Sequence, residues 1–82
     1  MDRQQLLDLF RRMATEVVEK DFSDVGHDAN VAELGIDSLG MLELVGALER
    51  ELDVAIPDEE LGGIQTVDQL LDVVGSRTAG RP

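Results

Sequence analysis

The sequence contains no cysteine, no tryptophan and no tyrosine, and it has one histidine among its 82 residues. Without cysteine, the chain cannot form disulfides, zinc–thiolate sites or a thiol nucleophile. A single histidine cannot build a multi-histidine metal site. No apolar run approaches the roughly 20 residues that a membrane span needs, and the mixed charges of residues 2–20 are unlike a signal peptide. We therefore expect one small cytoplasmic domain with little room for a deep catalytic pocket.

Basic residues are also scarce. The chain has 7 Lys plus Arg against 18 Asp plus Glu, which gives a formal net charge of −11. Such a chain repels phosphate backbones and anionic lipid surfaces, so the charge argues against nucleic acid and membrane as partners. The excess of acid lies between residues 21 and 62, because the segments on either side are balanced. This distribution is typical of a solvated acidic face or of a docking surface for proteins with basic patches.

Three segments show the periodicity of amphipathic helices, with aliphatic side chains at intervals of three and four. They are residues 3–20, 38–52 and 66–75. Between them lie connectors rich in Asp and Gly, 21–36 and 53–64. In the second connector, a proline followed by three acidic residues predicts a short helix. No strand alternation occurs. We therefore expect an all-α fold, a small antiparallel helical bundle of three main helices plus one short helix.

Residues with the character of helix caps mark the ends of these segments. The candidate N-terminal caps are Asp2 with Gln5, Asp37 before Ser38, and Thr66 with Gln69. Gly75 is a candidate terminator of the last helix. We therefore predict a single domain over residues 1–76 and a flexible C-terminal tail over residues 77–82.

Ser38 is the candidate functional residue because it lies where a loop meets a helix, in the run Leu34-Gly35-Ile36-Asp37-Ser38-Leu39. The first turn of a helix presents unpaired N–H groups and the positive end of the helix dipole. A phosphate on a hydroxyl at this place is stabilised. Ser38 is therefore either an attachment point for a phosphorylated group or only the first residue of its helix.

This run resembles the carrier-serine motif of acyl carrier proteins. The similarity continues through Glu43-Leu44-Val45, Ala47-Leu48-Glu49, the connector 56–60 and Thr66-Val67, and it covers roughly residues 6–75. It implies a free-standing carrier and not an enzyme. Ser38 would accept 4′-phosphopantetheine from coenzyme A through a Mg²⁺-dependent phosphopantetheinyl transferase, and acyl groups would ride as thioesters on the thiol of that arm. A chain without cysteine must obtain its thiol in this way.

The resemblance also assigns roles to single residues. Asp37 would help the transferase recognise the site. The residues that would face partner enzymes are Leu39, Leu42, Glu43 and Glu49. The residues that would line the core, or a cleft for an acyl chain, are Leu44, Leu48, Leu52, Ile56 and Leu71. The expected partners are the transferase and acyltransferases, ketosynthases or other acyl-processing enzymes with basic docking patches. We expect a monomer with no metal.

Three residues depart from the pattern of carriers in housekeeping fatty-acid synthesis. Gly40 and Arg50 stand where those carriers usually have acids, and Gly46 replaces an exposed apolar residue. The departures favour polyketide or other specialised-metabolite assembly, with fatty-acid synthesis as the alternative. Asp37 argues against an aminoacyl or peptidyl carrier, because peptidyl carriers usually have Gly at this position.

Three other function classes have weaker support. The run 35–39 is one insertion away from the G-D-S-L motif of esterases, but His27 lies in the acidic loop rather than beside a nucleophile. Residues 21–26 begin like a calcium-binding loop, but position twelve is Ala32 instead of a bidentate acid. Only adventitious divalent binding by Asp21, Asp24 and Asp28 is left. An acidic interaction module that carries no cargo would leave Ser38 unmodified.

Overall fold

The computed structural model describes residues 2–79, and within them it contains three α-helices and two single-turn 3₁₀ helices. In chain order they are α1 (Arg3–Val18), η1 (Ala32–Leu34), α2 (Ser38–Leu52), η2 (Asp58–Glu60) and α3 (Val67–Ala79). The strand-like pairing in this part of the chain is one isolated antiparallel bridge between Asn30 and Thr66. The prediction of an all-α fold is confirmed. Within the described residues, no helix has both the length and the apolar character needed to cross a membrane.

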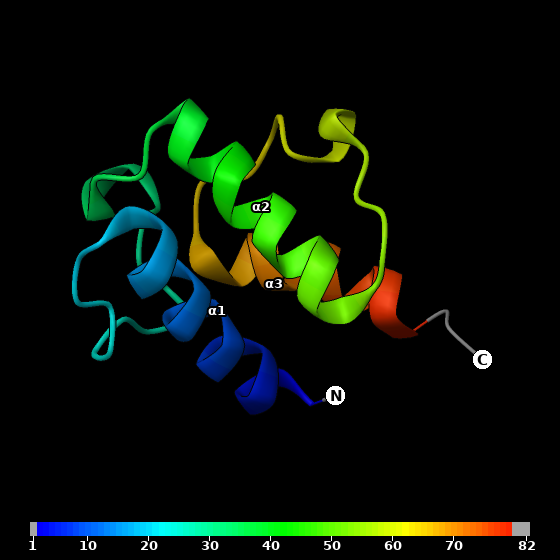
Figure 1. Cartoon of the computed structure of the whole chain (residues 1–82), viewed down its shortest axis with the longest axis horizontal. Coiled ribbons are helices and arrows are strands. Elements are labelled where there is room, and N and C mark those ends of the chain that lie inside the picture. Colours follow the sequence, from blue (N-terminus) through cyan, green and yellow to red (C-terminus); the bar gives the residue numbers. More distant parts are fainter. Residues whose placement is uncertain (1, 80–82) are drawn as a thin grey trace.

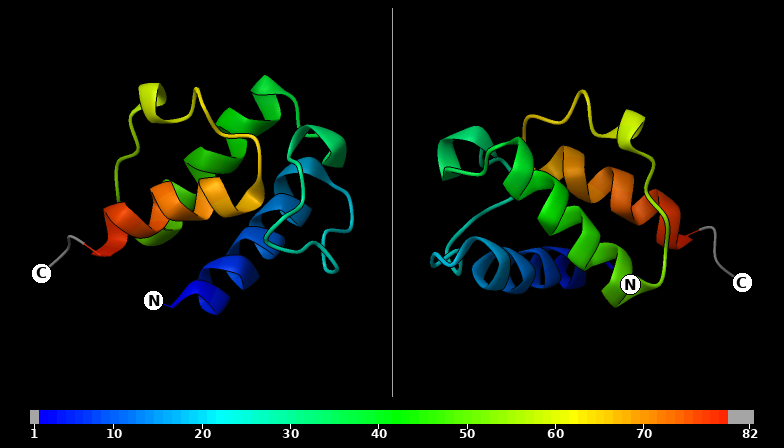
Figure 2. Two further views of the ribbon diagram at one scale, coloured as in Figure 1. Left: turned by 180° about the vertical axis from the view of Figure 1, so that it is seen from behind. Right: turned by 45° about the horizontal axis from the view of Figure 1, so that its top comes forward.

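The three α-helices pack as a bundle in which α2 runs back across α1 in the opposite sense (Figure 1). The connector 53–66, drawn in yellow, leaves the end of α2 and returns along the bundle to the start of α3. Figure 2 shows from two further sides that this connector passes over one side of the bundle like a strap. The other connector, 19–37, joins the end of α1 to the start of α2.

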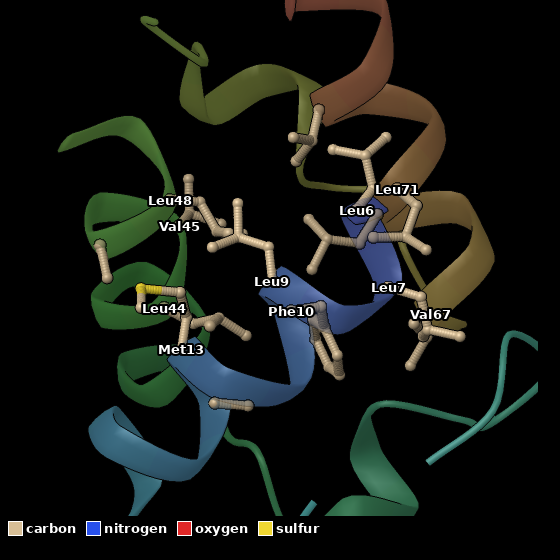
Figure 3. Packing of buried hydrophobic residues seen from close by; sticks show 14 of the residues in the cluster. Leu6, Leu7, Leu9, Phe10, Met13, Leu44, Val45, Leu48, Val67 and Leu71 are labelled. Carbon is tan, nitrogen blue, oxygen red and sulfur yellow. The ribbon is translucent and has the colours of Figure 1, made fainter. Parts of the chain in front are cut away.

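The core is built from aliphatic side chains and two phenylalanines, and none of the described polar or charged residues is buried in it. Leu9 and Met13 of α1 lie toward Leu44 and Leu48 of α2, and Leu6 of α1 lies beside Leu71 of α3 (Figure 3). Phe10 is fully buried at the centre of this packing. One stripe of α1 therefore holds both other helices, as its periodicity predicts.

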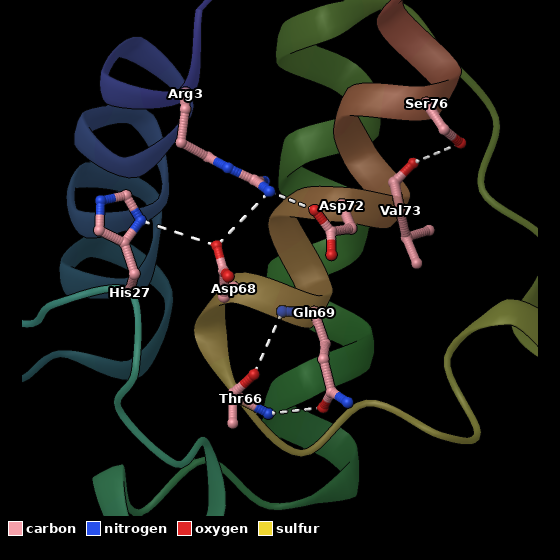
Figure 4. Close-up of polar contacts among 8 residues, drawn as sticks. All are labelled: Arg3, His27, Thr66, Asp68, Gln69, Asp72, Val73 and Ser76. Atoms are coloured by element: carbon pink, nitrogen blue, oxygen red, sulfur yellow. Dashed lines mark hydrogen bonds and ion pairs between the residues drawn. The ribbon is translucent and has the colours of Figure 1, made fainter.

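Capping bonds confirm two of the predicted helix starts. The Asp2 carboxylate accepts a hydrogen bond from the Gln5 N–H at 2.8 Å, and the Gln5 side chain accepts one from the Asp2 N–H at 2.8 Å. At α3, the Thr66 N–H donates to Gln69 Oε1 at 3.0 Å, and the Gln69 N–H donates to Thr66 Oγ1 at 3.2 Å (Figure 4). Each box satisfies backbone donors that an uncapped helix end would leave unpaired.

Ion pairs join α1 to the first turns of α3. Arg3 pairs with Asp68 at 3.5 Å and donates a hydrogen bond to Asp72, while His27 Nδ1 lies 3.8 Å from Asp68 (Figure 4). The hydrogen bond to Asp72 raises the pKa of the Arg3 guanidinium. All four side chains are partly exposed, so these contacts align the helices without adding much stability.

The structure corrects two predicted helix ends. α1 stops at Val18 rather than near Lys20, because Glu19 adopts the left-handed conformation with φ of 61° and caps the helix. α3 continues through Gly75 to Ala79, so Gly75 does not terminate it and residues 77–79 of the predicted tail are helical. A Cβ at Gly75 would lie 3.4 Å from Leu6 Cδ1, so α1 and α3 lie in contact at this point. Residues 80–82 of the predicted tail lie outside the described residues.

The position of Phe10 yields a stability prediction. Replacing Phe10 by Ala should lower the free energy of unfolding by about 3–5 kcal/mol, because the lost ring leaves a cavity between the helices. Urea denaturation followed by circular dichroism measures this change. The matched variant Leu42→Ala removes a side chain that is 50% exposed and should cost far less. Equal losses in the two variants would contradict the packing described here.

Candidate functional site

Ser38 is held at the start of α2 by the three residues that precede it. Gly35 makes a left-handed turn with φ of 84°, and a Cβ there would lie only 2.8 Å from Lys20 Nζ. Ile36 then enters the core, where it is 5% exposed. Asp37 returns to the surface as the N-cap of α2, and the exposed Ser38 follows as the first helical residue. The turn and the buried anchor together fix the point where Ser38 emerges.

The cap on α2 confirms the third predicted helix start. The Asp37 carboxylate accepts a hydrogen bond from the Gly40 N–H at 2.7 Å. A Cβ on Gly40 would lie 3.2 Å from Asp37 Oδ1, which is tight, and 3.4 Å from Ile36 Cγ2, which is an ordinary contact. Glycine at position 40 therefore gives the cap room to close, a local reason that the sequence did not reveal. The structure thus assigns Asp37 a capping role beside the recognition role expected of it.

Three of the four residues expected to face partners are exposed on α2. Leu39 is 64% exposed and Leu42 is 50% exposed, and they are the large apolar side chains that the described surface leaves open to solvent. Glu43 is exposed one residue further along. Glu49 differs, because it is half-buried and its carboxylate accepts the Ile56 N–H at 2.8 Å. Leu39, Leu42 and Glu43 therefore form an exposed face of α2.

The five residues expected to line a core or a cleft belong to the core. Leu44, Leu48, Ile56 and Leu71 are buried, and the half-buried Leu52 packs against the same cluster. None of these five lines the cavity beside Ser38.

An open cavity of about 630 Å³ lies beside Ser38. Its walls come from the loop before α2, the first turns of α2 and the strap over residues 58–65. The polar residues that line it are Asn30, Asp37, Ser38, Asp58 and Gln65. Its main apolar lining residues are Val31, Ile36, Met41, Leu42, Leu61 and Ile64. A chain attached to Ser38 therefore has a cavity of mixed polarity within immediate reach.

The strap that forms one wall of this cavity is tied down at three places. The Glu49 carboxylate holds its beginning through the Ile56 N–H. Arg77 of α3 donates two hydrogen bonds to the Glu60 carboxylate, one of them from Nε at 2.9 Å. The Val31 N–H donates to the Gln65 carbonyl at 2.9 Å and closes its end. These ties position the cavity wall although no regular strand or long helix supports it.

Most arginines among the described residues form ion pairs with carboxylates. Arg12 forms an ion pair with Glu51 at 3.4 Å, and Arg77 pairs with Glu60. The exposed Arg50 is an exception, since the structure shows no ion pair or hydrogen bond for its side chain within residues 2–79. Its Nη1 lies 3.6 Å from where a Cβ on Gly46 would be, so the guanidinium lies close to Gly46 on α2. In the preceding loop, a hydrogen bond from the Ser23 N–H lowers the pKa of Asp21.

The sequence predicted neither Asn30 nor the strap residues as part of the site. Asp58, Leu61, Ile64 and Gln65 are about thirty positions from Asn30 in the chain, and no short motif links the two segments. The only local signal was that Leu61 and Ile64 are apolar residues within a connector that is otherwise rich in acid and glycine.

Comparison with known proteins gives a consistent result. Residues 6–74 match the family model described as a phosphopantetheine attachment site. An acyl carrier protein from Thermosynechococcus vestitus is 35% identical over 80 residues, which cover 96% of this chain and 99% of that protein.

Solved structures agree with the family match. The crystal structure of an acyl carrier protein from Thermotoga maritima superposes with a TM-score of 0.89 at 34% identity, covering 96% of this chain and 93% of the other. The actinorhodin acyl carrier protein of Streptomyces coelicolor, in its acetyl form, gives 0.71 at 29% identity, over 96% and 92%. A chain in the structure of the ishigamide ketosynthase/chain length factor gives 0.73 at 26% identity, over 95% and 99%.

The cap on α2 gives a prediction that separates capping from charge. Asp37→Ala should lower the free energy of unfolding by about 1 kcal/mol, because the Gly40 N–H loses its acceptor. Asp37→Asn keeps a side-chain oxygen at the same distance from the backbone, so it should lower the free energy of unfolding much less. Urea denaturation of both variants measures the difference. If Asn proved as costly as Ala, the negative charge rather than the hydrogen bond would carry the effect.

Proposed function

The chain belongs to the phosphopantetheine-binding family of acyl carrier proteins, and from that premise we propose that Ser38 bears the 4′-phosphopantetheine group. Proteins of this family are carriers and not catalysts. When bound, the group supplies a terminal thiol on which acyl groups are held as thioesters. This chain has no cysteine, so its own side chains offer no competing thiol.

One observation carries the assignment to Ser38: its side chain is exposed in the first turn of a capped 15-residue helix, next to an open cavity. The unpaired N–H groups and the helix dipole favour a phosphodiester on Ser38. The other serines have different surroundings. Ser23 lies in the loop after α1, and the Ser76 hydroxyl donates to the Val73 carbonyl within α3. Neither is close to the start of a helix.

The attachment site can be tested by intact mass spectrometry. We expect the chain to gain the mass of one phosphopantetheine after incubation with coenzyme A, Mg²⁺ and a broad-specificity phosphopantetheinyl transferase. Ser38→Ala should abolish the gain and leave the helical circular dichroism nearly unchanged. The matched variant Ser76→Ala should still be loaded. Loading of Ser38→Ala would show that another residue is modified.

The exposed face of α2 formed by Leu39, Leu42 and Glu43 supports transient binding to enzymes with basic patches. Leu39 and Leu42 offer apolar contact, and Glu43 adds charge on the same exposed side of α2. Contacts of this size steer and orient a partner more than they hold it. The tether on Ser38 then raises the effective concentration of the acyl group at the partner's active site. The phosphopantetheinyl transferase, acyltransferases and ketosynthases are the partners that we propose.

We further propose that the pathway is polyketide or other specialised-metabolite assembly. Two similar structures point that way by their own descriptions, the actinorhodin carrier and the ishigamide ketosynthase/chain length factor. The surface of α2 supports the same choice, because the exposed cation Arg50 interrupts its acidic character. Fatty-acid synthesis is the alternative, and the similar proteins from Thermotoga maritima and Thermosynechococcus vestitus are consistent with it.

The unpaired Arg50 provides a test of this choice. Arg50→Glu should raise kcat/KM for loading by a housekeeping malonyl transferase about two- to fivefold, mainly through KM, since a surface charge contact contributes about 0.5–1 kcal/mol. The gain should shrink as salt is raised toward 1 M, where the Debye length is about 3 Å. Steady-state kinetics with the phosphopantetheine-bearing carrier as the substrate measure kcat/KM and its dependence on salt.

The control for this test is Arg12→Glu, which alters a cation that already pairs with Glu51. It should not improve loading. If Arg50→Glu also gave no gain, and the unaltered carrier were loaded equally well by housekeeping and pathway enzymes, the assignment to a dedicated pathway would be wrong.

A further inference from the structure

The cavity beside Ser38 differs from the core in the polarity of its wall. The core buries no polar side chain among the described residues, whereas Asn30, Asp58 and Gln65 line the cavity together with apolar residues. A saturated hydrocarbon that filled this space would remove those polar groups from water without giving them hydrogen bonds. Each such loss costs about 1–3 kcal/mol. The wall therefore favours an occupant that carries hydrogen-bonding groups of its own.

Asn30 is the most fixed of these polar side chains. Its Oδ1 accepts hydrogen bonds from the Ala32 N–H at 2.9 Å and the Glu33 N–H at 3.2 Å, and these bonds hold the start of the single-turn helix η1. Its backbone pairs with Thr66 across the isolated bridge. The two bonds to Oδ1 prevent the amide from rotating, and within residues 2–79 its Nδ2 group has no partner. Asn30 thus presents two N–H donors that are open to solvent and have no acceptor among the described residues.

The charged groups on the same wall restrict what can satisfy these donors. Asp37 and Asp58 are carboxylates, so they accept hydrogen bonds and disfavour a second negative charge nearby. An uncharged carbonyl oxygen meets both conditions, because it accepts from Asn30 without adding charge. The attachment point on Ser38 keeps any tethered chain within reach of this wall.

We propose that Asn30 is a positioning residue that donates a hydrogen bond to a carbonyl oxygen of the chain tethered on Ser38, so that the cavity favours oxygenated over saturated cargo. This inference rests on the proposed attachment to Ser38. Three sources supply such an oxygen: the amide groups of the phosphopantetheine arm, the thioester carbonyl of any acyl group, and the oxo group of a β-ketoacyl chain. Only the oxo group distinguishes oxygenated from saturated cargo, and the experiment below tells it apart from the other two.

The test follows the Asn30 side-chain amide directly by nuclear magnetic resonance. The ¹⁵N-labelled chain is prepared in four forms: unmodified, with the bare arm, with a hexanoyl arm and with a 3-oxohexanoyl arm. A promiscuous transferase loads each arm from the matching coenzyme A derivative, and intact mass confirms loading. The Asn30→Ser variant identifies the Asn30 amide pair by its absence, while its hydroxyl can still cap η1. The Gln4 amide, bonded to Asp8 at 3.1 Å, is the internal control and should not move.

We expect the Asn30 amide signals to shift in the 3-oxohexanoyl form and not in the hexanoyl form. A shift already present with the bare arm, and unchanged by either acyl chain, would assign the hydrogen bond to the arm and overturn the preference for oxygenated cargo. Equal shifts with both acyl chains, and none with the bare arm, would overturn it too, since the shared thioester carbonyl or apolar filling would account for them. Unchanged signals in all forms would overturn it as well. A failure of loading, seen in the mass, would instead refute the attachment to Ser38 and this inference with it.

The variant adds a second readout at the cavity wall. Methyl signals of Ile36 and Ile64, which line the cavity, should differ between the hexanoyl and 3-oxohexanoyl forms of the unaltered chain. In Asn30→Ser that difference should be lost. A difference that persists in the variant would show that Asn30 does not position the oxygenated chain.

Discussion

The apolar stripe of α1 packs against α2 and α3 at the same time, and the remaining structure depends on this contact (Figure 3). Phe10 lies fully buried where the three helices meet. Each buried side chain of this size contributes roughly 1.5–3 kcal/mol. The chain has no cysteine, so no disulfide contributes to its stability, and no polar side chain is buried among the described residues. Apolar burial therefore sets how the helices lie, and polar contacts act at the edges of an arrangement that is already fixed.

The site inherits its geometry from this packing. Ile36 is anchored in the core, so the chain must emerge at Asp37, whose cap then starts α2 at Ser38. The opposite wall of the cavity is held in a different way, because the strap has few buried side chains and relies on the ties at Glu49 and Arg77. A fixed position for Ser38 beside a wall held by a few polar bonds fits the carrier function proposed for this chain.

The fold determines which charged side chains form ion pairs, and composition alone does not show this. Arg3, Arg12 and Arg77 form ion pairs with carboxylates of their own chain. Arg50 has no such partner among the described residues and lies toward the end of α2 that is far from Ser38. Which charged side chains meet is decided by the fold, and the proposed choice of partners rests on this arrangement.

The sequence by itself determined the helices, their N-terminal caps and the carrier motif, since each depends on residues within one or two turns of one another. It also placed Leu44, Leu48 and Leu71 correctly among core candidates, because periodicity reports which face is buried. It could not extend α3 beyond Gly75, a residue whose environment is set by contact with α1. Only the tertiary structure decided the cavity, because its walls join residues 30–42 to residues 58–65, which are distant in the chain and meet through packing rather than through any local pattern of residues. The bonds that hold Glu49 and the Asn30 amide are local, but only the cavity places Asn30 beside Ser38.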